Sequence, residues 1–473
     1  MTFTFPRALR AAACAVPLLV TACGGGGDGY GGSPPPVDCS TAGQQDWLRG
    51  YMNDWYFWYR LSPNPSPAGY STVDAYFDAL LYGGGDLIPN GAGKTWPKDS
   101  WSYSQSTVDF NRFFGDGQTL GYGLAVNGLE AVAQGATRLF VRYTEPASPA
   151  ALTNSVAGGL TRGDEILFVN GTPVATLIAN NDFSVLTPNL AGDSLRLDIR
   201  RATGATASVT LAAAVYSLTT VQNGQVLFTP GATPGTGRKL GYVFVKDMIS
   251  QVNSPLATRM ANFKSQGVQD IVLDLRYNGG GLVSVGSTVA SHLGGAAGSG
   301  LRYARLLYSD KQQSSNQDYL FTNPNNWAGF SKVYVLMGER TCSASEQVIN
   351  GLRGIGVNVV AVGGTSCGKP VGFLPRDNSC GSTYSVVNFE SVNARNEGRY
   401  FDGLQATCTV SEDFSKPIAD TNDPLLVAAA YHIDHGACPA GTSLREQPQA
   451  RSSVPRVPYR GADGGERTGM MAR

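Results

Sequence analysis

Two serines in a run of small residues, Ser343 and Ser345 in "TCSASEQVING", are the candidate nucleophiles of this 473-residue chain. A serine hydroxyl becomes a nucleophile when a neighbouring base takes its proton. The sequence contains three histidines, His292, His432 and His435. The first ends a predicted helix, where a structural or capping role is the simpler interpretation. The other two lie near the end of the predicted folded region. A histidine base is therefore disfavoured, and the same scarcity disfavours a zinc hydrolase.

Lysine is the other base that proteins pair with serine. Lys369 lies in "GGTSCGKPVGF", 26 positions after Ser343 and directly after a predicted strand. A lysine base must be neutral, which requires burial to lower its pKa from about 10.4 to about 7–8, a cost of roughly 3–5 kcal/mol. Small and apolar neighbours could supply that environment. Taken alone, "GKP" fits an ordinary surface lysine in a turn equally well.

A glycine run completes the set of candidate catalytic groups. In "DLRYNGGG" successive glycines follow a buried strand, so their N–H groups can approach a substrate carbonyl closely. Gly280 or Gly281, together with the N–H of Ala344 after the nucleophile, would form an oxyanion hole. A plain glycine turn and a phosphate cradle are the alternatives, but no Gly-Lys-Ser/Thr pattern follows to support nucleotide binding.

The elements that must position these residues alternate between strands and helices from 215 to 440. Segments such as "DIVLDLRY", "KVYVLMG" and "VNVVAVG" read as buried strands, with "PLATRMANFKSQGV" and "SEQVINGLRGIG" as helices. This alternation predicts an α/β catalytic core with a mostly parallel sheet, whose site lies beyond the carboxyl ends of the strands. Both the glycine run and the Ser343 loop fall at such ends.

Two smaller domains are predicted before this core, giving an α/β multidomain fold. Residues 39–112 are aromatic, with apolar residues at helical spacing in "DWLRGYMNDWYFWYRL" and "STVDAYFDALL". We expect this aromatic crowding to be the core of a helical N-terminal domain rather than a ligand platform. Residues 117–214 instead show strands, an Asn-Gly turn and a hairpin.

The order of elements in 117–214 resembles a PDZ domain. "GYGL", residues Gly121, Tyr122, Gly123 and Leu124, resembles the carboxylate-binding loop of that family, and "GLTRGDEILFVNG" supports the resemblance. Exposed N–H groups of such a loop can bind a chain terminus, while the next strand adds the peptide to its edge. The implied ligand is a peptide with an apolar C-terminus.

The two ends of the chain are predicted to lie outside the folded domains. Residues 1–22 read as a signal peptide that ends in "VTAC", a motif similar to the bacterial lipobox, so Cys23 would be lipidated. Ordinary cleavage near Ala22 is the alternative. A Gly/Pro-rich tether, 23–38, follows, and Gly24 favours the outer membrane by resemblance to Gram-negative sorting. Residues 446–473 are polar and Pro/Gly-rich, and we predict them to be disordered.

Six cysteines remain after the signal and lipid positions, which suits disulfides in an exported protein. They allow fifteen pairings. Cys380 with Cys408, which bracket a strand-rich insertion, is the preferred pair, leaving Cys39 with Cys438 by elimination. Cys342 and Cys367 flank the two candidate catalytic residues and form either a disulfide or two buried thiols. No spacing fits a zinc site.

Together these motifs resemble the C-terminal processing (tail-specific) serine peptidases. The matching elements are "DLRYNGGG" at 274–281, "CSASE" at 342–346 and "GK" at 368–369. The resemblance implies Ser343 as nucleophile and Lys369 as base, with Ser345 as the alternative nucleophile. Thr341 and Phe373 depart from the family pattern. In many relatives the residue at the position of Phe373 is a glutamine, which helps to orient the lysine. Glu346 is expected to cap or pin the helix.

The sequence therefore predicts a lipid-anchored serine endopeptidase on the periplasmic side of a bacterial envelope. Its substrates would be partly unfolded exported proteins with exposed apolar C-termini, and no metal or cofactor is implied. Zero net charge, with 15% charged residues, argues against a nucleic-acid partner. One alternative is a non-catalytic PDZ binding protein on a degenerate peptidase core, motivated by Phe373. An esterase has less support, because no G-x-S-x-G motif surrounds Ser343.

Overall fold

Two mixed sheets and their helices carry the residues singled out above, in a computed structural model of the chain. The structure describes residues 38–442, except 90, 92, 134, 153–157, 234–235 and 331, together with 469–472. The predicted signal peptide, Cys23 and almost all of the tether lie outside these residues, as does most of the predicted disordered tail. The prediction of a mixed α/β multidomain fold is confirmed.

The first sheet has the order β10-β11-β12-β16-β17-β22. Its strands β11 to β22 run parallel, and β10 is antiparallel at the edge. The strands are β10 (Val221–Phe228), β11 (Lys239–Val245), β12 (Asp270–Asp274), β16 (Lys332–Met337), β17 (Asn358–Gly363) and β22 (Cys408–Thr409). The helices that cover it are α7 (Asn253–Ser265), α8 (Val283–Gly298), α9 (Ala344–Gly354) and α10 (Pro424–His435).

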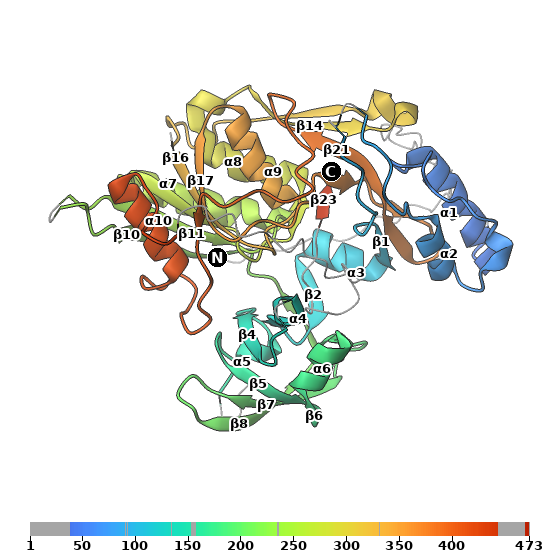
Figure 1. The fold of residues 1–473 in the computed structure, drawn as a ribbon, viewed down its shortest axis with the longest axis horizontal. Helices are drawn as coiled ribbons and strands as arrows, with labels where there is room; N and C mark the ends of the chain where they lie inside the picture. Colours follow the sequence, from blue (N-terminus) through green and yellow to red (C-terminus); the bar gives the residue numbers. More distant parts are fainter. Residues whose placement is uncertain are drawn as a thin grey trace, which may run out of the picture. The chain divides into compact units, whose positions relative to one another are not determined.

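Both faces of this sheet are buried, which is why its strands read as continuous apolar runs. On β11, Tyr242 and Phe244 pack in one hydrophobic cluster with residues of α10. Val243 and Val245 point the other way, into the cluster that contains residues of α7, α8 and α9. Figure 1 shows α8 and α9 on one side of the sheet and α10 on the other.

The second sheet contains a strand from the far end of the chain. Its order is β13-β23-β18-β21-β14-β15. The strands are β13 (Gly280–Leu282), β14 (Arg302–Tyr308), β15 (Gln317–Leu320), β18 (Val371–Phe373), β21 (Val387–Val392) and β23 (Gly469–Met471). Residues 469–472 are buried, so the prediction of disorder does not hold for them. The apolar pair Met470–Met471 explains this, because the strand places both side chains in the core.

The N-terminal helices pack on the second sheet and on a small third sheet. Helix α1 (Thr41–Trp55) and α2 (Val73–Leu80) begin at the caps Ser40 and Thr72. The aromatic run is core, as predicted, with Trp47, Tyr51 and Trp55 buried. The helix ends earlier than the pattern suggests, because the N–H of Phe57 donates to the carbonyl of Val387 in the sheet. The third sheet has the order β1-β20-β19, formed by β1 (Tyr103–Ser106), β19 (Arg376–Asp377) and β20 (Ser382–Ser385).

Residues 118–217, the β-rich lobe, have their own hydrophobic core. Its main sheet has the order β3-β4-β5-β7-β8, with β6 paired to β5, and β2 and β9 form a separate two-stranded ribbon. The strands are β2 (Gln118–Gly121), β3 (Leu124–Val126), β4 (Leu139–Thr144), β5 (Glu165–Val169), β6 (Thr172–Pro173), β7 (Ser194–Arg200), β8 (Thr206–Ala212) and β9 (Ala214–Ser217). The helices are α4 (Gly128–Ala133), α5 (Pro149–Leu152) and α6 (Val174–Asn180). The predicted turn at Asn170–Gly171 is confirmed, since both residues have positive φ.

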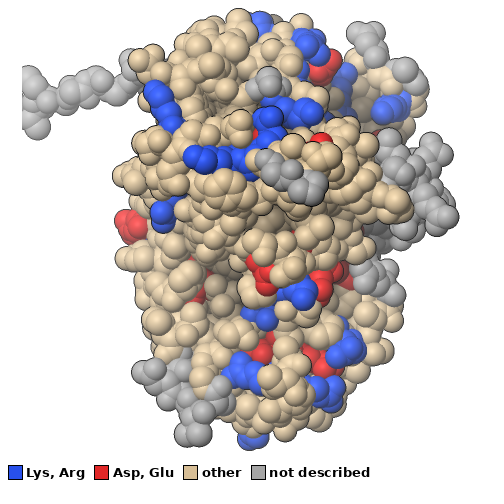
Figure 2. Space-filling model, turned by 90° about the vertical axis from the view of Figure 1, so that its left-hand side faces the viewer, with Lys and Arg blue, Asp and Glu red and all other residues tan. Residues whose placement is uncertain are grey.

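The surface carries both signs of charge. On the face shown in Figure 2, basic and acidic side chains are interspersed and most of the surface is uncharged. Among the described residues, no helix has the length and apolar character needed to cross a bilayer.

The disulfides differ from the preferred prediction. The structure pairs Cys39 with Cys380, Cys342 with Cys367, and Cys408 with Cys438. The prediction of Cys380 with Cys408 is therefore wrong, as is Cys39 with Cys438. Cys380 lies between β19 and β20, where α1 packs, whereas Cys408 begins β22 on the other sheet. The order of elements along the sequence does not show that Cys380 and Cys408 lie at different sheets.

We expect peptide mapping without reductant to recover Cys39 linked to Cys380 and Cys408 linked to Cys438. Replacing Cys408 and Cys438 together by serine should lower the free energy of unfolding by about 2–4 kcal/mol in urea titrations, because the unfolded chain gains conformational entropy when it is no longer cross-linked. A peptide that links Cys380 to Cys408 would contradict the fold described above.

Candidate active site

The turn between β16 and α9 holds Ser343 in a strained conformation. Its φ is 62° and its ψ is −114°, a region that residues other than glycine rarely adopt. The side chain is fully buried, and its hydroxyl has no hydrogen-bond partner among the described residues. Helix α9 begins at the next residue, so the N–H of Ala344 lies at the start of the helix beside the serine. The arrangement presents a hydroxyl to a site rich in backbone donors.

The carboxylate of Glu346 organises the loops on both sides of this serine. Its Oε2 accepts hydrogen bonds from the N–H of Ser343 at 2.8 Å and of Lys369 at 2.9 Å. Its Oε1 accepts from the N–H of Gly368 at 2.8 Å and from the Ser366 hydroxyl. Burial raises the pKa of the Glu346 carboxyl, and these hydrogen bonds oppose that rise. The side chain is fully buried, and every hydrogen bond it accepts comes from one of the two loops.

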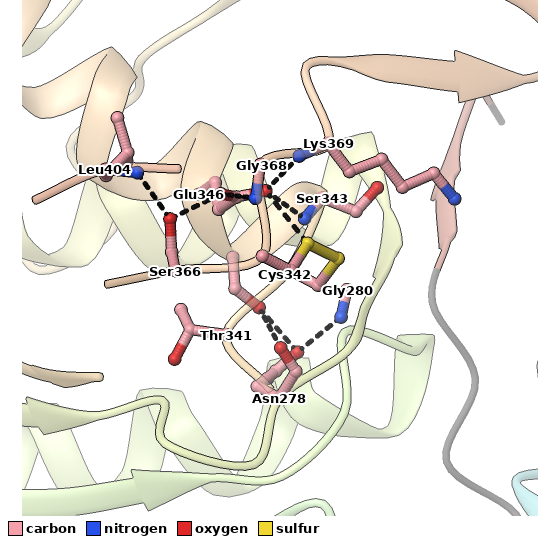
Figure 3. Close-up of a disulfide and its surroundings, with 12 residues drawn as sticks. Asn278, Gly280, Thr341, Cys342, Ser343, Glu346, Ser366, Gly368, Lys369 and Leu404 are labelled. Atoms are coloured by element: carbon pink, nitrogen blue, oxygen red, sulfur yellow. Dashed lines mark hydrogen bonds between the residues drawn. A yellow bond between two sulfur atoms is a disulfide. The ribbon is translucent and has the colours of Figure 1, made fainter. Parts of the chain in front are cut away.

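Ser343 and Lys369 are adjacent because two connections join their loops. One is the shared oxygen of Glu346, and the other is the Cys342–Cys367 disulfide, with a Cα–Cα distance of 5.2 Å. Figure 3 shows the Ser343 side chain extending toward that of Lys369, with the disulfide beneath them. The structure thus brings together the two residues that the sequence analysis proposed as nucleophile and base.

Phe373 packs against Lys369. The Lys369 Nζ lies 3.9 Å from the centroid of the Phe373 ring, and both side chains are fully buried. A glutamine expected at position 373 is thus replaced by an aromatic face, which positions the lysine by contact and cation–π attraction. Helix α9 carries a buried glutamine, Gln347, one turn after Ser343. Its Nε2 donates to Ser391, whose own N–H donates to the carbonyl of Pro370.

Asn278 connects the glycine run to the serine loop and separates the two candidate serines. Its Oδ1 accepts from the N–H of Gly280 at 2.9 Å and from the Ser345 hydroxyl at 2.7 Å. Its carbonyl accepts from the N–H of Cys342 at 3.0 Å. Since the proton of Ser345 is already donated to Asn278, Ser345 is a structural residue and Ser343 is the candidate nucleophile.

The same contacts revise the predicted oxyanion donors. The N–H of Gly280 is occupied by Asn278, so Gly280 does not serve as a donor as predicted. Successive residues of a strand direct their backbone groups to opposite sides. The carbonyl of Gly280 and the N–H of Leu282 bond to Met248, so Gly281 faces the other side, toward β23. The donors that remain are the N–H groups of Gly281 and Ala344.

Arg276 explains the charged part of "DLRYNGGG". The guanidinium is buried and contacts three carboxylates, those of Asp274, Glu412 and Asp423. Asp423 caps α10, so the ion pairs fix the turn after β12 to the helix on that face of the sheet. The ion pairs of Arg276 therefore hold the turn that leads into the glycine run, and they do not contact the Ser343 hydroxyl.

Other titratable groups are engaged elsewhere. The three histidines hydrogen-bond to Asn325, Tyr334 and Tyr431, and none of these contacts lies at Ser343. Two groups of described residues bring ligand-type atoms within 4.8 Å of one another, Cys408 with His432 and Cys438, and Cys342 with Glu346 and Cys367. In each group both sulfurs belong to a disulfide, which removes their ability to act as thiolate ligands.

The predicted peptide-binding loop lies at the edge of the lobe. All four residues, Gly121 to Leu124, are buried, and β3 has β4 as its one strand neighbour among the described residues. Gly123 has a φ of 82°, and a Cβ there would meet Ser148 at 1.9 Å, so this position requires glycine. The hollow beside Gly123 and Leu124 has a volume of about 20 Å³, which is space for a water molecule.

Three contributors to the site were missed or underestimated from the sequence. Glu346 was expected to cap or pin the helix, in line with the capping signal Ser-x-x-Glu at 343–346, but its hydrogen bonds to the Lys369 loop were not predicted. The hydrogen bonds of Asn278 could not be predicted, because the only signal in the sequence is that this residue stands directly before the glycine run. The third is the strand β23, whose segment was predicted to be disordered.

Two segments of the chain match models of a known peptidase family. Residues 239–405 match the model of peptidase family S41, and residues 43–103 match the N-terminal domain of that family. No curated protein matches the chain. A solved structure from Bacteroides fragilis, provisionally described as an S41 protease, is 24% identical with a TM-score of 0.59, and the match covers 82% of this chain and 96% of that one. This likeness concerns the fold.

A second structure, a photosystem II D1 C-terminal processing protease, is 19% identical with a TM-score of 0.47, over 78% of this chain and 92% of that one. The two family matches show that residues 43–103 and 239–405 are similar to domains of peptidase family S41.

We expect Glu346→Gln to lower the free energy of unfolding by about 3 kcal/mol or more, because an amide cannot accept from all four donors and leaves buried N–H groups unpaired. Urea unfolding measures the change. The matched control is Asp46→Asn, which also converts an acid to an amide but on the exposed face of α1. Equal stability of the Glu346→Gln variant and the parent would contradict the role assigned to this carboxylate.

Proposed function

We propose that the chain is an endopeptidase of the C-terminal processing type, with Ser343 as nucleophile and Lys369 as general base. The observation that carries the proposal is the junction of the two loops, where one oxygen of Glu346 accepts from the N–H groups of both residues and the disulfide joins their neighbours. This junction fixes the backbones of the candidate nucleophile and base next to each other, as a serine–lysine pair requires.

In the proposed reaction, the neutral amine of Lys369 takes the proton of the Ser343 hydroxyl as its oxygen attacks the substrate carbonyl carbon. The carbonyl oxygen becomes an oxyanion, which the N–H groups of Ala344 and Gly281 stabilise. The C–N bond then breaks, and the leaving amine takes the proton from Lys369. Water hydrolyses the acyl-enzyme by the same steps, with Lys369 again accepting and returning one proton.

The β-rich lobe is proposed to act as a PDZ domain that captures an unstructured, apolar C-terminus. The support is the position of β3 at the sheet edge next to the glycine loop, Gly121 to Leu124, which is the arrangement that strand addition needs. Because the hollow beside this loop is small, Tyr216 and Leu218, which line it, would have to move when a peptide binds.

One observation favours a second candidate, a PDZ binding protein that does not catalyse. The Phe373 ring lies against the Lys369 Nζ, and an aromatic face attracts an ammonium group. A lysine held in its charged form cannot accept the serine proton. The peptidase remains the favoured function, because the strained conformation and buried free hydroxyl of Ser343 are not needed for binding at the lobe.

We also propose that Cys23 carries a lipid and anchors the protein on the periplasmic side of the envelope, with the outer membrane favoured. The support is the sequence motif "VTAC" and the disulfides, which suit an oxidising compartment. Partition of the parent into a detergent phase, lost in Cys23→Ala, is the expected result.

The decisive experiment measures cleavage of an unfolded protein that ends in an apolar C-terminus. We expect Ser343→Ala and Lys369→Ala each to lower kcat by at least about 10⁴-fold, since the nucleophile and its base act as a unit. The matched controls are Ser254→Ala and Lys98→Ala, both at exposed positions, which should leave kcat within about twofold of the parent.

The same substrate with a charged C-terminus tests the lobe. We expect a higher KM with little change in kcat, because the lobe binds the end of the chain away from the reacting bond. A parent protein that binds the apolar-tailed substrate and never cuts it would instead support the binding function.

A further inference from the structure

The strand β23 and the residue after it, Ala472, form a segment that we call the tail strand, residues 469–472. It lies between β13, which carries the oxyanion donor Gly281, and β18, which follows Lys369. Figure 1 shows this short strand inserted between elements that are distant from it in sequence. The tail strand is therefore placed between the two walls of the candidate active site.

Backbone pairing on both sides holds the tail strand. It runs parallel to β13, with Gly280 opposite Gly469 and Gly281 opposite Met470. The N–H of Gly469 donates to the carbonyl of Gly279 at 3.0 Å. On the other side, Phe373 lies opposite Met471, and the N–H of Ala472 donates to the carbonyl of Phe373 at 3.0 Å. The tail strand is thus inserted into the sheet, paired through its backbone with a strand on each side, which is one of the ways in which sheets take up extended segments.

The carbonyl oxygen of Gly469 lies at the oxyanion donors. A single point, where a Cβ on Gly280 would stand, is 2.2 Å from this oxygen, 2.9 Å from the Cβ of Ser343 and 3.0 Å from the nitrogen of Ala344. Gly281 also directs its N–H to this side of β13, as the ladder shows. The carbonyl of Gly469 therefore lies beside the Ser343 loop, on the side of β13 that carries the candidate oxyanion donor.

The side chains of the tail strand fill the remaining space. Met470 and Met471 are both fully buried, and Ala472 is 6% exposed. The Nε2 of Gln347 donates to the Met470 sulfur at 3.4 Å, while its Oε1 is buried without a hydrogen-bond partner among the described residues. Since Gln347 follows Ser343 by one helical turn, an occupant of the groove is contacted from the nucleophile's own helix.

We infer that the groove between β13 and β18 binds an extended peptide with a small residue followed by long apolar ones, and that the chain's own tail strand is its resident ligand. The tail strand competes with substrate, so the enzyme is active only when it leaves. This inference deepens the proposed function and rests on it for the identity of the competing molecule. Because the side chains buried there, Met470 and Met471, are long and apolar, we expect the groove to prefer long apolar residues in a substrate.

The test introduces Met470→Asp and Met471→Asp together in the full chain. Two buried carboxylates are incompatible with the filled groove, so the tail strand should be released. If it fills the groove in about nine of ten parent molecules, its release raises kcat/KM on an unfolded substrate about tenfold. The matched control, Met470→Leu with Met471→Leu, keeps the apolar volume and should retain the parent value within about twofold.

A second measurement does not depend on catalysis. In a Ser343→Ala background, a fluorescein-labelled peptide with the sequence of residues 465–472 should bind the double aspartate variant and not the parent, as measured by fluorescence anisotropy. If the parent and the aspartate variant with Ser343 intact cut no substrate, but the peptide binds only the aspartate variant in the Ser343→Ala background, the proposed function fails and the resident ligand stands.

Two results would overturn the inference. One is equal kcat/KM and equal peptide binding for the parent and the aspartate variant. The other is loss of the mass of residues 470–473 from the parent but not from Ser343→Ala, because the tail would then be a substrate that is removed and not a standing competitor. Intact-mass spectrometry of both proteins after prolonged incubation distinguishes these cases.

Discussion

The buried carboxylate of Glu346 is the interaction on which the candidate active site depends. A buried charge is costly unless it is compensated, and here the compensation comes from three backbone N–H groups and the Ser366 hydroxyl rather than from a cation. The donors belong to the loops after β16 and after β17. Satisfying the carboxylate therefore fixes these loops against each other, and the positions of Ser343 and Lys369 follow. The Cys342–Cys367 disulfide adds a covalent connection to the same junction.

The fold brings these loops to one place by simple means. Strands β12, β16 and β17 are consecutive neighbours in a parallel sheet, so the segments after their carboxyl ends meet at one edge. Asn278 then ties the first loop to the second, and Glu346 ties the second to the third. The second sheet provides the walls of the groove, β13 and β18, with the tail strand between them. These connections use backbone N–H groups together with the hydroxyls of Ser345 and Ser366.

Local patterns in the sequence predicted most of the elements and the two central residues. Apolar runs such as "VYVLM" and the glycine signals identify the strands and turns around Ser343 and Lys369, because these features act over a few residues. Pairings between distant segments were not predictable. Cys380 belongs beside Cys39 because α1 packs on the sheet that β20 joins, and Gly280 loses its N–H to a side chain two positions away. Residues 469–472 read as disordered because the strands that bind them, β13 and β18, lie far earlier in the sequence.

The ion pair between Arg340 and Glu130 connects the β-rich lobe to the loop of the nucleophile. The Nε of Arg340 lies 2.8 Å from a carboxylate oxygen of Glu130, on α4, and the second oxygen accepts from the guanidinium at 3.0 Å. Burial acts to raise the pKa of Glu130, but Arg340 outweighs it and lowers that pKa to about 2, so the pair stays charged at neutral pH. Arg340 stands three residues before Ser343. If the lobe binds a peptide as proposed, a ligand that displaced this pair would change the affinity at Ser343, and thermodynamic reciprocity would then require that occupancy of the groove change the lobe's affinity for that ligand by the same factor.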